Sequence, residues 1–154
     1  FKKQYPQILF PGKDQFDHSR KTVDYEIEPV LIPYNPLTWI PSFWKIKKWK
    51  PQILILKYWI PFFAPAFGFV IFLLKLFSET KVVYIIDNID FHEKWAFGKM
   101  LTKFALGKAD RLITLSKSVY ENARKMFPRT EIIPAFHPSY FIFDHNRFNS
   151  ESAK

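Results

Sequence analysis

Residues 81–86 read Lys-Val-Val-Tyr-Ile-Ile, and this stretch decides the fold class. Its five consecutive apolar residues show no polar alternation, which is typical of a strand buried on both faces of a parallel sheet. Runs of the same character predict three more strands, at residues 52–56, 111–115 and 131–133. Weaker patterns predict additional strands at residues 28–32 and 5–10.

Helical stretches separate the apolar runs. Residues 61–77 and 94–108 have the length of crossover helices, and Ser116 is placed to cap a further helix that Pro128 ends. Strands that alternate with helices of this length form βαβ units with right-handed crossovers. The sequence therefore predicts an α/β fold, a Rossmann-like doubly wound parallel sheet.

The segment before the first clear strand combines prolines with a basic, aromatic stretch. Asn35 and Pro36 suit a helix start, whereas Pro41 predicts a break with Ser42 capping a second start. Residues 44–50 then read Trp-Lys-Ile-Lys-Lys-Trp-Lys. Tryptophan beside lysine suits a membrane interface, and it equally suits a solvated helix face whose tryptophans pack on the sheet.

Composition limits the classes of partner. The 154 residues are 48% hydrophobic, carry a formal net charge of +9 and include no cysteine, which excludes disulfides and thiolate zinc sites. A basic domain attracts anionic partners such as nucleic acid, anionic lipid or phosphorylated substrates. No nucleic-acid recognition motif accompanies the basic stretch, so we expect no nucleic acid as a partner.

Residues 58–74 contain no charged side chain and approach the length of a membrane span. Pro61 and Pro65 lie in the first half of this stretch, and it directly follows a predicted buried strand. These features favour a buried crossover helix over a transmembrane helix, and partial immersion in a membrane surface is a third interpretation. The lack of cysteine permits a reducing compartment, and we expect a cytoplasmic protein, peripheral on the inner face of the plasma membrane.

Ligands of open α/β sheets bind beyond the carboxyl ends of the strands, which directs attention to the residues that follow each run. The loop after residue 86 is the richest in polar groups, with Asp87-Asn88 and then His92-Glu93. These side chains suit binding of sugar hydroxyls and supply of a general base. The alternative is structural: Asn88 or Asp90 caps the next helix while His92 and Glu93 are solvated in its first turn.

Several other chemistries lack their signatures. His92-Glu93 lacks the second histidine of a zinc protease because Ala96 stands at that position, so we expect no metal. Ser116 has no nucleophile-elbow glycines around it and suits a helix cap better. The four glycines are scattered, so no phosphate-binding loop is predicted.

An ordered set of motifs resembles bacterial group 1 (family 4) glycosyltransferases of the GT-B type. The resemblance spans roughly residues 5–140 and rests on residues 9–13, 35–39, 59–67, 87–88, 91–93, 101–106, 109–110, 133–134 and 137–138. It implies the N-terminal, acceptor-side half of a two-domain enzyme without its first strand. Residues 1–143 would form this partial domain, and residues 144–154 would begin the interdomain linker or a tail.

The resemblance also implies an activity: transfer of a sugar from a nucleotide-sugar donor to a saccharide or lipid-linked acceptor. It implies no cofactor, since the donor is a substrate held mainly by the second domain, and it implies that this half alone is inactive. An anionic membrane surface would be a further partner. The implied catalytic residues are Asp87 and His92, and the implied acceptor-binding residues are Asn88, Glu93, Trp59, Ser116 and His137.

One position departs from the family pattern, because relatives often carry histidine where this chain has Asp87. An acid in place of an imidazole implies altered specificity or lost activity. A non-catalytic membrane-associated binding domain, or the remnant of a truncated gene, is the alternative function. An α/β hydrolase or reductase is disfavoured by the missing nucleophile elbow and glycine fingerprint.

Overall fold

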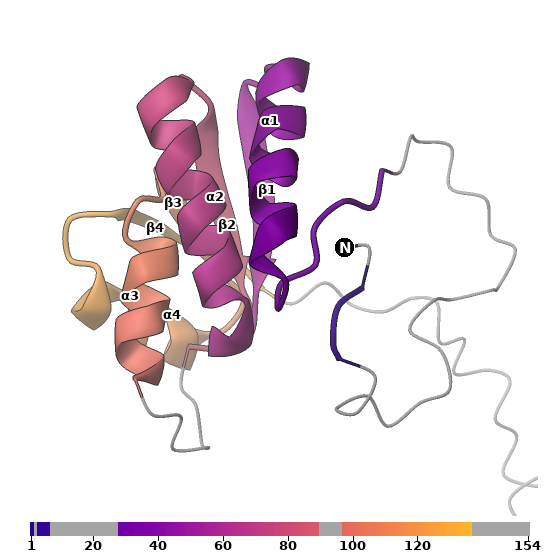
Figure 1. Ribbon diagram of the computed structural model, residues 1–154. Helices are drawn as coiled ribbons and strands as arrows, with labels where there is room; N and C mark the ends of the chain where they lie inside the picture. Colours follow the sequence, from indigo (N-terminus) through magenta and orange to yellow (C-terminus); the bar gives the residue numbers. More distant parts are fainter. Residues whose placement is uncertain (2, 7–27, 90–96, 137–154) are drawn as a thin grey trace, which may run out of the picture.

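The computed structural model describes residues 1, 3–6, 28–89 and 97–136 and shows a four-stranded parallel sheet (Figure 1). The strands lie side by side in chain order: β1 (Ile53–Tyr58), β2 (Lys81–Ile86), β3 (Arg111–Thr114) and β4 (Glu131–Pro134). All four strong strand predictions are confirmed. So is the α/β, Rossmann-like class, because every pair of neighbouring strands is parallel.

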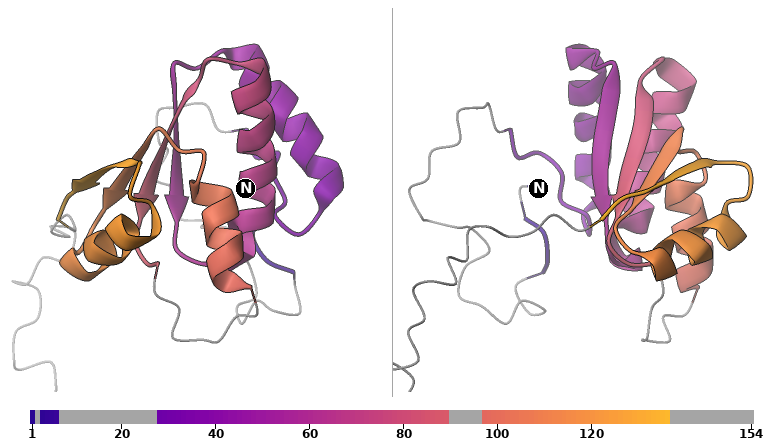
Figure 2. Two further views of the ribbon diagram at one scale, coloured as in Figure 1. Left: turned by 90° about the vertical axis from the view of Figure 1, so that its left-hand side faces the viewer. Right: turned by 180° about the vertical axis from the view of Figure 1, so that it is seen from behind.

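The helices form one layer against this sheet. In chain order they are the short 3-10 helix η2 (Pro36–Thr38), α1 (Trp39–Trp49), the 3-10 helix η3 (Pro61–Phe63), α2 (Ala64–Phe77), α3 (Gly98–Leu106) and α4 (Lys117–Met126). Helices α2, α3 and α4 each connect one strand to the next, and right-handed crossovers between adjacent strands place them on the same face. Figure 2 shows the sheet in front of the helices when the molecule is seen from behind.

Burial alternates along the strands and separates the two faces of the sheet. On the helix side, Val82, Tyr84 and Leu112 are fully buried in the main core. On the other side, Ile53 and Ile55 remain 56% and 61% exposed. The described residues place no helix over this second face, which we call the bare face, so the second layer of a doubly wound sheet is not seen in the described part of the chain.

The apolar segment at residues 58–74 packs inside the domain. Pro61 starts η3, and α2 then buries seven of its residues, Ile71 and Leu74 among them. At 14 residues, α2 is about 21 Å long, well short of the roughly 30 Å hydrocarbon core of a bilayer. No helix within the described ranges has the length and apolar character to cross a membrane. The predicted crossover helix is confirmed.

Two local predictions are wrong. Pro41 does not break the chain, because it is the third residue of α1, where the backbone N–H has no partner within the helix in any case. Ser42 donates to the Thr38 carbonyl at 2.7 Å instead of capping a second helix. Residues 28–32 form no strand. The Ile32 N–H donates to the Thr38 hydroxyl at 3.0 Å, so this N–H is not available for a hydrogen bond to a neighbouring strand.

The caps predicted at Asn35 and Ser116 are confirmed. The Asn35 side chain accepts from the Leu37 N–H at 3.1 Å and starts η2. The Ser116 hydroxyl accepts from the Val119 N–H at 3.3 Å and starts α4, which ends just before Phe127 and Pro128. Helix α3 begins at Gly98, and residues 7–10 and 94–96, where parts of a strand and a helix are predicted, lie outside the described residues.

Candidate functional site

The carboxyl ends of the strands meet at one edge of the sheet. The register aligns Tyr58 of β1, Ile86 of β2, Thr114 of β3 and Pro134 of β4. The hydrogen-bond ladder continues one residue further, since the Asp87 N–H donates to the Tyr58 carbonyl at 3.0 Å and the Ala135 N–H to the Thr114 carbonyl at 2.8 Å. The first residues after β2 and β4 are therefore part of the same hydrogen-bond ladder as the strands.

Asp87 forms an ion pair at this edge. Its Oδ2 lies 2.9 Å from the Nζ of Lys57, which projects from β1 onto the bare face. The two residues are close because Lys57 is in register with Ile85, and the side chain two positions beyond Ile85 points to the same face. The pair marks the point where the bare face meets the carboxyl edge.

The other carboxylate oxygen of Asp87 has a different environment. Oδ1 is buried and has no hydrogen-bond partner within the described residues, and the same is true of the Thr114 hydroxyl on the neighbouring strand β3. Buried polar atoms without a partner are rare in folded proteins because losing water without gaining a hydrogen bond costs roughly 1–3 kcal/mol. Thr114 is fully buried on the helix side of the sheet, whereas Asp87 lies on the side of Lys57, so the Asp87 carboxylate is the acceptor that a donor at this edge would meet.

Sequence reasoning named Asp87 and missed Lys57. The signal was present in the strand itself: Lys57 is the one charged residue of Ile53–Tyr58, in a run otherwise fit for burial. Its position follows Ile53 and Ile55 at a spacing of two, so it shares their face. That face could not be identified as exposed until the helices were placed.

The structure brings together only part of the predicted site. Asn88 follows Asp87 and is half-buried, and Ile89 after it is buried in the core. His92, Glu93 and His137 lie outside the described residues, so their predicted roles stay predictions.

Trp59 and Ser116 both contribute to the stability of the fold, Trp59 through packing and Ser116 through a helix cap. The Trp59 ring lies 4.6 Å from that of Phe63, between centroids, and packs against the core. The Ser116 hydroxyl serves the α4 cap and lies 3.3 Å from the Ser118 hydroxyl. The cap interpretation of Ser116 is therefore confirmed, and its acceptor-binding role stays a prediction.

Two buried tyrosines of the sheet, Tyr58 and Tyr84, form hydrogen bonds to α3 on the helix side. The Tyr58 hydroxyl is 2.8 Å from the Thr102 hydroxyl, and the Tyr84 hydroxyl donates to the Ala105 carbonyl at 3.2 Å. Burial raises the pKa of Tyr58 to about 12 although the Thr102 hydrogen bond opposes the shift. Burial, and secondarily the charge of Tyr58, raise the pKa of Tyr84 well above its ordinary value. Both phenols stay neutral at physiological pH and anchor α3 to the sheet.

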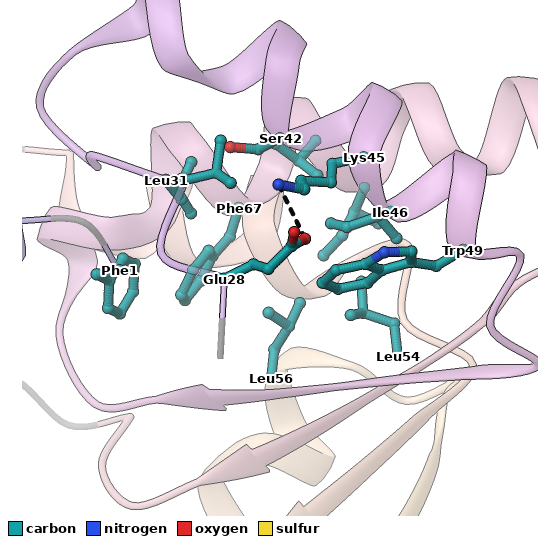
Figure 3. A pocket seen from close by; sticks show the side chains of 13 residues that line it. Phe1, Glu28, Leu31, Ser42, Lys45, Ile46, Trp49, Leu54, Leu56 and Phe67 are labelled. Atoms are coloured by element: carbon teal, nitrogen blue, oxygen red, sulfur yellow. Dashed lines mark ion pairs between the residues drawn. The ribbon is translucent and has the colours of Figure 1, made fainter. Parts of the chain in front are cut away.

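An apolar hollow lies away from this edge, between α1, α2 and the outer strand β1 (Figure 3). At its polar rim Lys45 and Glu28 form an ion pair of 2.8 Å, so their charges neutralise each other. Its volume of about 130 Å³ is well below the 300–1,000 Å³ typical of small-molecule sites. We therefore regard the carboxyl edge, and not this hollow, as the candidate site.

Within the described ranges, no group of three or more histidine or acidic residues is arranged to hold a metal ion. The chemistry available at the edge is that of the Asp87 carboxylate and the Lys57 ammonium. These groups accept and donate hydrogen bonds and orient hydroxylated ligands.

Fold and site together define the class: a Rossmann-like α/β domain with a polar, charge-paired site at the carboxyl edge of its sheet. No protein-family model, curated protein or solved structure matches the chain. The glycosyltransferase resemblance therefore rests on the motifs in the sequence.

Proposed function

We propose that this domain forms the acceptor side of a glycosyltransferase that moves a sugar from a nucleotide-sugar donor to a saccharide or lipid-linked acceptor. One observation carries the proposal. Asp87 stands at the carboxyl edge with Oδ2 paired to Lys57 and with Oδ1 lacking a donor among the described residues. A sugar hydroxyl supplies such a donor, and the edge is where open α/β sheets bind ligands.

In the transfer, the acceptor oxygen forms a bond to the anomeric carbon while the bond from that carbon to the nucleotide phosphate breaks. The Asp87 carboxylate accepts the proton of the attacking hydroxyl, and the Lys57 ammonium keeps the carboxylate oriented. The nucleotide sugar would be held mainly by a second domain. Catalytic roles for His92, and acceptor contacts by Glu93 and His137, belong to the same proposal and rest on the motif resemblance alone.

The test is acceptor binding by the 154-residue chain. Saccharides of increasing length, and nucleotide sugars separately, are titrated against the protein while chemical shifts are followed by NMR. Asp87→Asn removes the charged acceptor, and we expect it to weaken saccharide binding by about 10- to 100-fold, the range for a hydrogen bond to a charged group.

A matched control exists at the opposite end of the sheet. Arg111 and Glu131 form an exposed ion pair of 2.7 Å between the first residues of β3 and β4. Glu131→Gln changes charge by the same amount and should leave saccharide affinity unchanged. Equal affinity of Asp87→Asn and the parent chain, or no saccharide binding at all, would reject the acceptor role.

The second candidate is a non-catalytic, membrane-associated binding domain. The observation in its favour is that α1, α2 and α3 contain lysines and no acidic residue. A chain that binds vesicles while neither saccharide nor nucleotide sugar binds would support this candidate against the enzyme. For either function we propose a cytoplasmic protein that is peripheral on the inner face of the plasma membrane.

A further inference from the structure

The outer surface of the helix layer has an unusual composition. Figure 1 shows α1, α2 and α3 side by side in front of the sheet. Each of these helices contributes to the core, for example through Phe43 of α1, Ile71 of α2 and Leu106 of α3. On the outward side each helix carries a pair of large apolar residues at a spacing of four, which places both on one stripe. These residues are Ile40, Trp44, Phe72, Leu76, Met100 and Phe104, all exposed. We call this the three-helix surface.

Two lysines, Lys47 and Lys108, bridge the apolar stripes of neighbouring helices. The Lys47 ammonium of α1 lies 5.0 Å from the Trp44 ring centroid and 5.3 Å from that of Phe77, so it spans the seam between α1 and α2. The Lys108 ammonium, just after α3, lies 5.3 Å from the Phe72 ring centroid of α2 and spans the second seam. Cations over ring faces at these distances are attracted by the ring quadrupole.

The charge on the three helices has a single sign. Lys48 and Lys103 are exposed, and none of the three helices contains an aspartate or glutamate. Helix α4 differs, because it includes Glu121 and its exposed residues are polar. The combination of aromatic, aliphatic and cationic groups without anions is therefore confined to one part of the helix layer.

We propose that the three-helix surface docks flat on an anionic membrane surface. Its apolar residues enter the boundary between headgroups and acyl chains, and its lysines extend to the lipid phosphates. This role holds whether or not the domain takes part in glycosyl transfer.

Other occupants fit the surface less well. A second copy of the chain docked helix to helix on this surface would bring lysines against lysines, because α1, α2 and α3 contain no carboxylate to complement them. Nucleic acid offers phosphates for the lysines, yet its backbone gives Ile40 and Leu76 no apolar environment. An anionic bilayer satisfies both kinds of side chain at once.

Flotation of the 154-residue chain with vesicles tests the proposal. We expect binding to phosphatidylcholine vesicles that contain phosphatidylglycerol, little binding to pure phosphatidylcholine, and weaker binding as salt is raised. Lys48→Glu with Lys103→Glu should lower the partition coefficient at least about tenfold, given the attraction of anionic lipid for each lysine. The matched control, Lys117→Glu with Lys125→Glu on α4, changes net charge equally and should alter the coefficient less than about twofold.

A second readout reports insertion. Trp44 is 58% exposed, so brominated phosphatidylcholine mixed into the anionic vesicles should quench its fluorescence. Trp44→Phe should keep vesicle binding and remove most of the quenching. Circular dichroism of each variant, compared with the parent, confirms that the fold is intact.

Four results would overturn the proposal: no vesicle binding, equal loss in the α4 control, binding without quenching, or equal binding to neutral vesicles. Binding to polyglutamate or heparin but not to vesicles would identify an acidic macromolecule as the partner instead.

Discussion

The ring of Phe104 in α3 lies directly against Gly68 in α2, so close that a β-carbon at position 68 would stand 2.3 Å from the Cε1 atom of the ring. This contact sets how closely the two helices approach. A glycine in the interior of a helix costs about 1 kcal/mol relative to alanine, so its presence needs a packing reason. The Phe104 ring supplies that reason.

Gly68→Ala should therefore lower the free energy of unfolding by about 1–2 kcal/mol, because overpacking outweighs the gain in helix propensity. In a Phe104→Ala background the ring is absent, and Gly68→Ala should stabilise the protein by up to about 1 kcal/mol. Urea unfolding of the four proteins gives the coupling energy. Equal effects of Gly68→Ala in both backgrounds would contradict the contact.

Asp110 and Val82 exchange two hydrogen bonds at the amino ends of β2 and β3. The Asp110 N–H donates to the Val82 carbonyl at 2.9 Å, and the Val82 N–H donates to the Asp110 carboxylate at 2.7 Å. Lys75 also donates to this carboxylate. Asp110→Ala should cost about 2 kcal/mol, since it leaves the Val82 N–H and Lys75 without this acceptor. Glu131→Gln, in the exposed ion pair, should cost at most about 1 kcal/mol under the same urea unfolding.

The same carboxylate predicts a pH dependence. Burial alone would raise the pKa of Asp110, but hydrogen bonds from Lys75 and Val82 and the charges of Lys75 and Lys81 hold it below its ordinary value. A lowered folded-state pKa stabilises the fold above the unfolded pKa of about 3.9, and this contribution is lost as pH falls through the folded value. The stability difference between parent and Asp110→Asn should therefore stay constant near neutral pH and shrink below about pH 4. A constant difference down to strong acid would contradict this linkage.

Tyr58 predicts an alkaline effect of the opposite kind. Its pKa is raised to about 12, mainly by burial, so the folded state keeps a proton that the unfolded state releases near pH 10. Stability should fall as pH rises from about 10 to 12, and Tyr58→Phe should make that fall shallower. At neutral pH this variant should cost only about 1 kcal/mol, because Thr102 keeps its bond to the Gly98 carbonyl. Thr102→Val, which leaves the buried phenol without its partner, should cost more, and the reverse order would contradict the assigned geometry.

The bare face makes a prediction about packing. Leu112 is fully buried on the helix side of β3, whereas Ile55 on the bare face of β1 is 61% exposed. Leu112→Ala should cost about 2–5 kcal/mol, and Ile55→Ala less than about 1 kcal/mol, because only the first leaves a cavity. Thermal unfolding distinguishes them. Equal costs would mean that another layer covers the bare face in the folded protein.

The candidate site was partly predictable. Asp87 could be located because the rule for parallel sheets directs attention to the residue after a buried strand. Its partner Lys57 could not, because pairing depends on the register of β1 against β2, and one residue of slip would move Lys57 to the other face. The position of Pro41 could not be predicted for a local reason: the first turn of a helix tolerates proline, so Pro41 is equally compatible with a helix that starts before it, as α1 does.

The amino-acid sequence by itself determined the strands, the crossover helices and the caps at Asn35 and Ser116. These features depend on short-range periodicity and on side chains that bond their own neighbouring backbone. Only the tertiary structure decided which face of the sheet the helices cover and that Lys57 forms an ion pair with Asp87. It also decided that the exposed apolar residues of α1, α2 and α3, with the lysines beside them, form one surface. Those relationships link residues far apart in the chain, and they arise from strand register and helix packing, which no local pattern encodes.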